Sequence, residues 1–148
     1  MTQKEKELLL KDLCARLPYG VKCNAVLKQI DGSLKSVFGK FKGYNGWANI
    51  GDNLVDIKTV KPYLRPMSSM TKEEDEWLND RINFSRDDEV DKIRQKWGIV
   101  MLEIYNNSGR YVFSNFTEIL DWLNAHHFDY RGLIEKGLAF EAPENMYK

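Results

Sequence analysis

The chain has 148 residues, of which 22 are Lys or Arg and 22 are Asp or Glu, so its formal net charge is zero with neutral histidines. Apolar residues make up 43% of the sequence and aromatic residues 12%, which is enough to fill the core of a domain and excludes intrinsic disorder over most of the chain. The sequence contains no apolar run near the roughly 18 residues that a membrane-spanning helix needs. We therefore expect a soluble protein with no membrane partner.

The first ten residues carry four charges of mixed sign and lack the apolar stretch of a secretory signal. The two cysteines, Cys14 and Cys23, have no zinc-site spacing and no nearby His. We expect both to be buried, reduced thiols in a cytoplasmic protein.

Charge differs between the two parts of the chain. Residues 1–66 contain 12 Lys or Arg and 6 Asp or Glu, a net charge of +6, whereas residues 67–148 contain 10 and 16, a net charge of −6. Such asymmetry indicates an electropositive surface on one part, attraction between the parts, or self-association.

Residues 2–17 are predicted to form a helix. Leucines recur at spacings of three and four, and Thr2 followed by Glu5 has the spacing of a capping box. Pro18 and Gly20 should end this helix.

Residues 21–60 read as four short antiparallel strands, which we place at 21–30, 34–44, 47–50 and 54–60. Asp31-Gly32 is a strong hairpin signal. Because strands this short leave a flat sheet half-uncovered, we expect a small curled antiparallel sheet, an SH3-like half-open barrel, with its bend near Gly39. Pro62 and Pro66 have no amide hydrogen to donate to a neighbouring strand, so we expect the chain to leave the sheet there as an extended segment.

The remaining chain is predicted to be mainly helical, with helices starting at Ser69 or Thr71, at Ser85 and at Ser114 or Asn115, and a last short helix over 130–136. Residues 99–113 fit either a hairpin or a continued helix. The predicted fold class is therefore α+β. Residues 1–66 hold the first helix and the sheet, and the mainly helical residues 67–148 pack on them as one compact unit.

The search for chemistry finds no phosphate-binding loop and no nucleophile elbow. One string, residues 122–132, gathers a polar cluster of His126, His127, Asp129 and Arg131. A His with Asp129 could act as a general base or hold a metal ion. The alternative is a structural corner between two helices, in which Phe128 and Tyr130 pack while Asp129 caps a helix or pairs with Arg131. We favour the corner, and expect no catalytic residue, no metal site and no cofactor.

The basic part offers a candidate binding surface, because positive side chains alternate there with aromatic ones, as in small β-domains that bind single strands. Strand alternation places Phe38 on the same face as Lys40 and Lys42. The candidate surface for nucleic acid or a protein partner consists of Lys35, Phe38, Lys40, Lys42, Lys58, Lys61 and Arg65.

Four segments carry a resemblance to known sequences: residues 11–23 (KDLCARLPYGVKC), 61–71 (KPYLRPMSSMT), 122–139 (WLNAHHFDYRGLIEKGLA) and 141–148 (EAPENMYK). They resemble a group of uncharacterised small proteins encoded by gut bacteria and their phages or mobile elements. The resemblance implies that genetic context and attaches no activity.

From these observations we predict a non-enzymatic protein-interaction or accessory module of phage or mobile-element type. The alternative is single-stranded nucleic-acid binding through the basic, aromatic N-terminal part.

Overall fold

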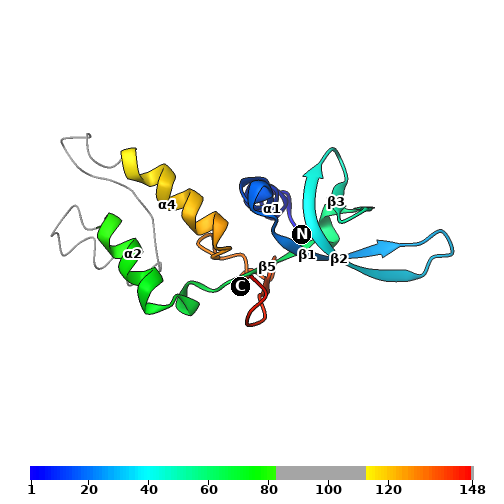
Figure 1. Ribbon diagram of the computed structural model, residues 1–148. Helices are drawn as coiled ribbons and strands as arrows, with labels where there is room; N and C mark the ends of the chain where they lie inside the picture. The colour runs from blue at the N-terminus through cyan, green and yellow to red at the C-terminus, as the bar shows by residue number, and fades with distance from the viewer. Residues whose placement is uncertain (83–112, 148) are drawn as a thin grey trace.

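A computed structural model describes residues 1–82 and 113–147 and shows an α+β fold (Figure 1). The predicted helix from Ser85 and the alternatives for 99–113 lie outside the described residues. The described helices and strands are α1 (Gln3–Ala15), β1 (Lys22–Lys28), β2 (Leu34–Tyr44), β3 (Ala48–Ile50), β4 (Asn53–Val55), β5 (Lys61–Leu64), α2 (Lys72–Ile82), α4 (Phe113–Ala125) and β6 (Phe140–Glu141).

The N-terminal helix forms as its sequence predicts. The Thr2 side chain accepts a hydrogen bond from the Glu5 amide, and the Glu5 carboxylate accepts one from the Thr2 amide, which completes the capping box. The helix ends at Ala15, two residues earlier than predicted. A 3₁₀ turn, Leu17–Tyr19, follows and closes on Gly20, whose φ of +66° suits glycine.

The strands form one six-stranded sheet in the order β4-β3-β2-β1-β5-β6. The predicted hairpin between β1 and β2 is confirmed, with Asn24 opposite Phe38. β2 pairs with β1 up to Lys40 and with β3 from Phe41 onward. Gly39 lies just before this change of partner, where a Cβ atom would come within 2.9 Å of the Gly51 nitrogen. The sheet can fold over itself there because residue 39 has no side chain.

The predicted SH3-like half-open barrel is not supported, because the sheet is mixed and does not close. Pro62 lies within β5, opposite Cys23 of β1, so the expected exit from the sheet is a strand. β6 then pairs in parallel with the other side of β5 and adds a further strand at that edge of the sheet. The predicted fourth strand, 54–60, is broken by a 3₁₀ turn, Ile57–Thr59, where the Asp56 side chain accepts from the Lys58 amide.

The expectation of a mainly helical C-terminal part is not supported either. Residues 130–137 form turns in place of the predicted helix. The Asp129 carboxylate accepts the amide hydrogens of Leu133 and Ile134, both at 2.8 Å, and Gly132 and Gly137 have φ near +67°. A Cβ atom on Gly132 would meet the Lys136 side chain.

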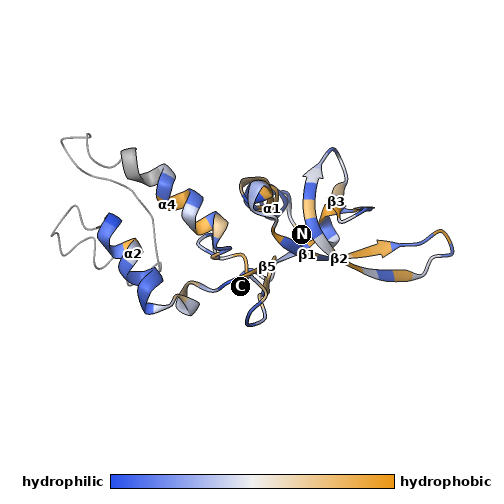
Figure 2. Ribbon diagram, in the orientation of Figure 1, coloured by the Kyte–Doolittle hydropathy of each residue, from blue (hydrophilic) through white to orange (hydrophobic). Residues whose placement is uncertain are grey.

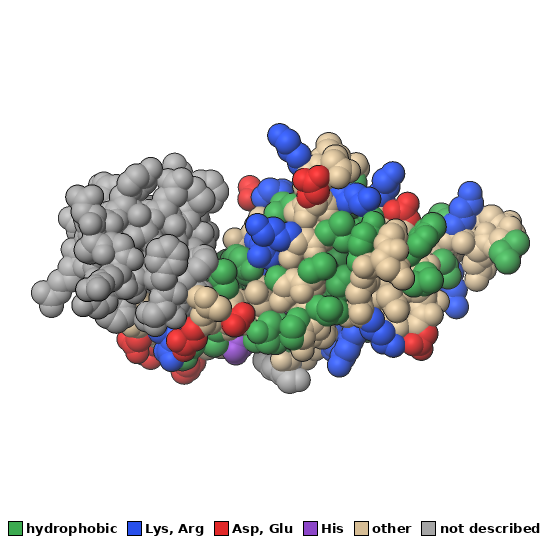
Figure 3. All heavy atoms as spheres, turned by 90° about the horizontal axis from the view of Figure 1, so that it is seen from above, with side chains coloured by type: hydrophobic (Ala, Val, Ile, Leu, Met, Phe, Trp, Pro, Cys, Tyr) green, Lys and Arg blue, Asp and Glu red, His purple; other side chains and the backbone are tan. Residues whose placement is uncertain are grey.

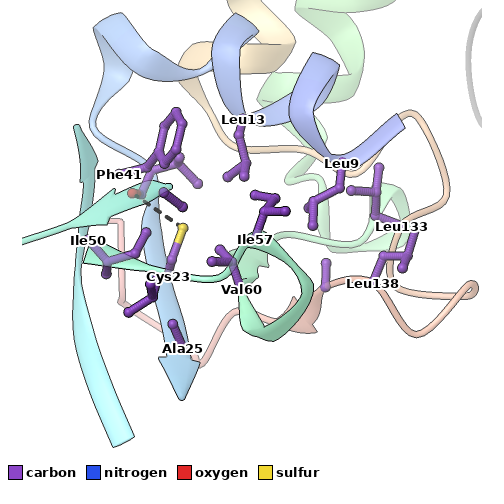
Figure 4. Packing of buried hydrophobic residues seen from close by; sticks show 14 of the residues in the cluster. Leu9, Leu13, Cys23, Ala25, Phe41, Ile50, Ile57, Val60, Leu133 and Leu138 are labelled. Atoms are coloured by element: carbon purple, nitrogen blue, oxygen red, sulfur yellow. Dashed lines mark hydrogen bonds between the residues drawn. The ribbon is translucent and has the colours of Figure 1, made fainter. Parts of the chain in front are cut away.

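The main core lies between α1 and the inner face of the sheet (Figure 4). Leu9 and Leu13 point from α1 toward Ile57 and Val60, and the C-terminal turns add Leu133 and other apolar side chains. A second, smaller cluster joins α2, α4 and the residues after α4, and consists of Leu78, Ile119, Leu123 and Phe128. α2 is hydrophilic along most of its length (Figure 2).

The two cysteines differ in burial, so the expectation that both are buried is wrong for Cys14. Cys14 is exposed on α1, whereas Cys23 lies in the core with no exposed surface. Burial raises the pKa of the Cys23 thiol and disfavours its thiolate.

We expect a thiol reagent at pH 8 to modify one thiol in the folded protein and two after unfolding in urea. Cys14→Ser should lose the fast reaction, and Cys23→Ser should keep it. Rapid native labelling of Cys23 would contradict the described core. The absorbance of the chromophore that the reagent releases counts the thiols that react in the folded and in the unfolded protein.

Candidate functional site

The predicted polar cluster lies at a bend after α4, where it contacts α1 through a buried ion pair. Asp12 and Arg16 are both fully buried, with Nε to Oδ2 at 2.8 Å and Nη2 to Oδ1 at 3.0 Å. Arg16 also donates to the Phe128 carbonyl at 2.7 Å, and Arg131 donates to Asp12 at 3.0 Å. Arg131 therefore pairs with Asp12 and contributes to holding the bend against α1, instead of pairing with Asp129 as we had considered.

Arg65 approaches the same bend from the end of β5. Its amide donates to the His127 carbonyl and its carbonyl accepts from the Asp129 amide, both at 2.8 Å. Its guanidinium lies over the Phe128 ring at 4.2 Å and makes two 2.8 Å bonds with Glu74 of α2. These contacts hold Arg65 in the junction between β5, α2 and the bend after α4. Arg65 is therefore not part of a binding surface with the lysines of the predicted set.

The two histidines have different environments. His126 stacks on Trp122 at 4.2 Å, and its Nδ1 lies 2.9 Å from the Trp122 carbonyl oxygen. His127 is 4% exposed, has a φ of +59° and stacks on Tyr147 at 3.8 Å. Burial, followed by the charge of Arg16, lowers the pKa of His127 from its ordinary value of 6.5 to about 4. His127 is therefore neutral at pH 7.

Tyr147 joins this junction from the C-terminal end of the chain. Its hydroxyl accepts from the Lys22 amide at 3.0 Å and donates to the Tyr63 carbonyl at 2.8 Å. These backbone groups belong to β1 and β5, just beyond their last paired residues. The phenol thus links the two strands where their ladder ends. The sequence did not predict this contact, because the C-terminal residues have no periodic pattern.

The four polar-cluster side chains each have a separate structural partner in this junction. In residues 1–82 and 113–147, no three His, Cys, Asp or Glu side chains lie close enough together to hold a metal ion. All four segments that carry the resemblance noted above contribute contacts here, through Asp12, Arg65, Phe128 and Tyr147. The arrangement is that of a corner that fixes distant segments.

The outer face of the sheet, opposite α1, carries a row of three aromatic side chains from three strands. The Phe38 ring meets Tyr63 edge-on at 5.9 Å, and Tyr63 meets Phe140 at 5.5 Å. Phe38 is 59% exposed and Phe140 41% exposed. Large aromatic side chains kept in water on a paired sheet leave π-faces available to a ligand.

Lysines border this row. Lys22 and Lys40 are directly opposite each other on β1 and β2 and share the outer face, since their neighbours Val21 and Cys23 are buried. Lys61 is opposite Asn24, which is opposite Phe38, and its Nζ lies 5.0 Å from the centre of the Phe140 ring. We call the set Lys22, Phe38, Lys40, Lys61, Tyr63 and Phe140 the outer-face platform.

The structure therefore brings together three of the seven predicted surface residues, namely Phe38, Lys40 and Lys61. Lys35 is opposite Leu27 on the other face of the hairpin, and Lys42 pairs with Asp52 at 2.9 Å in solvent. Lys58 lies in the turn before β5. Sequence reasoning missed Phe140 because a two-residue strand has no periodicity.

Comparison with protein-family models, with curated proteins and with solved structures finds no match to this chain. None of the helices within residues 1–82 and 113–147 combines the length and the apolar character needed to cross a bilayer.

Replacing Asp12 by Ala should lower the free energy of unfolding by about 3–5 kcal/mol, because Arg16 then becomes a buried charge without its partner. Urea unfolding followed by circular dichroism measures the loss. Asp52→Ala is the matched control, since its pair with Lys42 is exposed and its removal should leave the unfolding midpoint unchanged. Equal midpoints for the two variants would contradict the role of the buried pair.

Acid should weaken the fold through His127. The unfolded chain binds a proton at this residue below pH 6.5, whereas the folded protein binds it only near pH 4, so the free energy of unfolding falls as the pH drops between these values. Urea titrations from pH 7 to 4.5 should show wild type losing up to about 1.4 kcal/mol per pH unit more than His127→Asn. Asn tolerates the positive φ. Parallel curves would exclude this linkage.

Proposed function

We propose that this protein binds single-stranded nucleic acid on the outer-face platform. The observation that carries the proposal is the row of Phe38, Tyr63 and Phe140 on strands β2, β5 and β6, in which Phe38 and Phe140 are exposed and lysines lie alongside. Nucleobases stack on aromatic rings whatever their identity, and ammonium groups beside the rings meet the phosphates.

The geometry of the rings suits flat, unpaired bases. Contacts between the rings restrict their orientation, so little side-chain freedom remains to be lost when a base stacks on them. A base inside a duplex has its faces covered by its neighbours, which favours a single strand over a double helix. With stacking worth about 1–3 kcal/mol per base, two or three bases give a modest affinity without sequence readout.

The charge distribution supports the same proposal. The chain as a whole has zero net charge, but residues 1–66 have a net charge of +6. In the view of Figure 3, one group of Asp and Glu side chains lies at the end near α2, and Lys and Arg side chains, with some Asp and Glu among them, spread over the part that contains the sheet. A phosphate backbone would therefore be attracted to the sheet-containing part.

A protein-interaction or accessory role, without catalysis, is our second proposal, and the tip of the β1–β2 hairpin favours it. Ile30 and Leu34 are exposed there, at 110% and 71% of their reference areas. The hairpin projects away from the rest of the molecule (Figure 1), and exposed apolar tips mark contact sites. The phage or mobile-element context and a cytoplasmic location belong to both proposals.

Fluorescence anisotropy with a labelled single-stranded 12-mer tests the nucleic-acid proposal. We expect binding that weakens as salt rises, because phosphate contacts release counterions. Phe38→Ala should weaken binding about 5- to 100-fold through loss of stacking. Lys40→Gln should also reduce the dependence of log Kd on log salt by about one.

Matched variants distinguish binding at the platform from nonspecific binding elsewhere on the protein. Trp47 is 56% exposed in the turn before β3 and has no described ring contact with the platform, so Trp47→Ala should bind like wild type. Lys35→Gln should also bind like wild type, since Lys35 faces the other side of the hairpin. Absence of binding at low salt would overturn the proposal and leave Ile30 and Leu34 as the surface to test against proteins.

A further inference from the structure

A basic hollow lies between the start of α1, the start of β5 and the C-terminal turns, and it shares Lys61 with the outer-face platform. Its volume is about 270 Å³, and it is lined by residues of three separate segments, including Met1, Glu5, Lys58, Lys61, Lys136 and Leu138. Lys58 comes from the turn before β5, Lys61 is the first residue of β5, and Lys136 comes from the C-terminal turns. Three lysine residues thus line one concavity.

The one carboxylate among these lining residues is already engaged. Glu5 accepts the Thr2 amide hydrogen at 2.6 Å as part of the α1 capping box. This bond and the Thr2 side chain lower the pKa of Glu5. The helix N-terminus partly balances the carboxylate charge, so the three lysines leave the hollow with an excess of positive charge.

Lys136, which comes from the C-terminal turns, is held in place by hydrogen bonds to the backbone. The Lys136 Nζ donates to the carbonyl oxygens of Arg131 and Gly132, at 3.3 and 3.1 Å. An ammonium group has three hydrogens, so one is left for a ligand. Pre-positioning of this kind reduces the entropy lost when an anion binds.

Lys61 connects the hollow to the platform. It lines the hollow, and its Nζ also lies 5.0 Å from the centre of the Phe140 ring. Phe140 belongs to β6, the edge strand, and is the last ring of the row. A strand whose end nucleotide stacks on Phe140 therefore places its terminal group beside the hollow.

We propose that the hollow binds the terminal phosphate of a single strand lying on the platform, an inference that rests on the proposed function. A terminal phosphate monoester carries nearly two negative charges at pH 7, whereas an internal phosphodiester carries one. Three lysines around a concavity match the monoester better. The protein thus recognises a phosphorylated strand end.

The test compares three labelled 12-mers of one sequence, with a 5′-phosphate, a 3′-phosphate or hydroxyl groups at both ends and the fluorophore attached internally. We expect one phosphorylated end to bind at least about fivefold more tightly than the hydroxyl strand. Lys58→Gln should abolish this difference and leave the hydroxyl-strand affinity unchanged, since Lys58 is not part of the platform. Lys136→Gln should act in the same way from another segment.

Lys35→Gln, which removes an equal charge from the opposite face of the hairpin, should keep the preference for the phosphorylated end. Equal affinities for all three strands, with salt-dependent binding retained, would overturn this inference and leave the proposed function standing. Loss of the preference in Lys35→Gln as well would also overturn it, because general charge would then explain the effect. Failure of every strand to bind would overturn both proposals.

Discussion

The buried ion pair between Asp12 and Arg16 is the interaction on which the rest of this architecture depends. Both side chains lie out of water, and Arg16 and Arg131 together connect helix α1 with the bend more than 100 residues later. Removing charges from water is costly, so such a pair persists only when hydrogen bonds occupy most of its polar atoms. Here the Phe128 carbonyl and Arg131 supply them, and the pair is fixed only when the bend is docked.

Docking of the bend determines where the C-terminal residues go. Arg65 pairs its backbone with the bend, and the Asp129 carboxylate shapes the turns that follow. The chain then returns to the sheet and adds β6 beside β5. The docking of the bend on α1 thereby places Phe140 on the outer face of the sheet, next to Tyr63.

The two faces of the sheet have separate roles because of this arrangement. α1 and the C-terminal turns cover the inner face with leucines and other apolar side chains. The outer face leaves Phe38, Lys40 and Phe140 exposed to water, and in the part of the chain that the structure describes no helix packs over them. A sheet with one covered and one open face presents a rigid surface for a flat ligand, which is the property that our functional proposals use.

Local sequence by itself determined the first helix, its capping box, the β1–β2 hairpin and the exposure of Phe38. These features depend on residues at most 18 positions apart, through helix caps, turn geometry and strand alternation. Sequence reasoning also located the corner after α4 and the burial of Phe128, but turns take the place of the second helix that it expected there. It did so from neighbouring residues alone, and so the only partner that it offered for Arg131 was Asp129, as an alternative to a helix cap.

Only the tertiary structure decided the open sheet, the strand at Pro62, β6 and the partners of Arg131 and Tyr147. Each depends on a contact between residues far apart in the chain, such as Asp12 with Arg131 or Tyr63 with Tyr147. A two-residue strand has no periodicity of its own, and its pairing is specified by the edge it meets. The sequence therefore determined half of the platform, and the fold of the C-terminal turns onto β5 determined the rest.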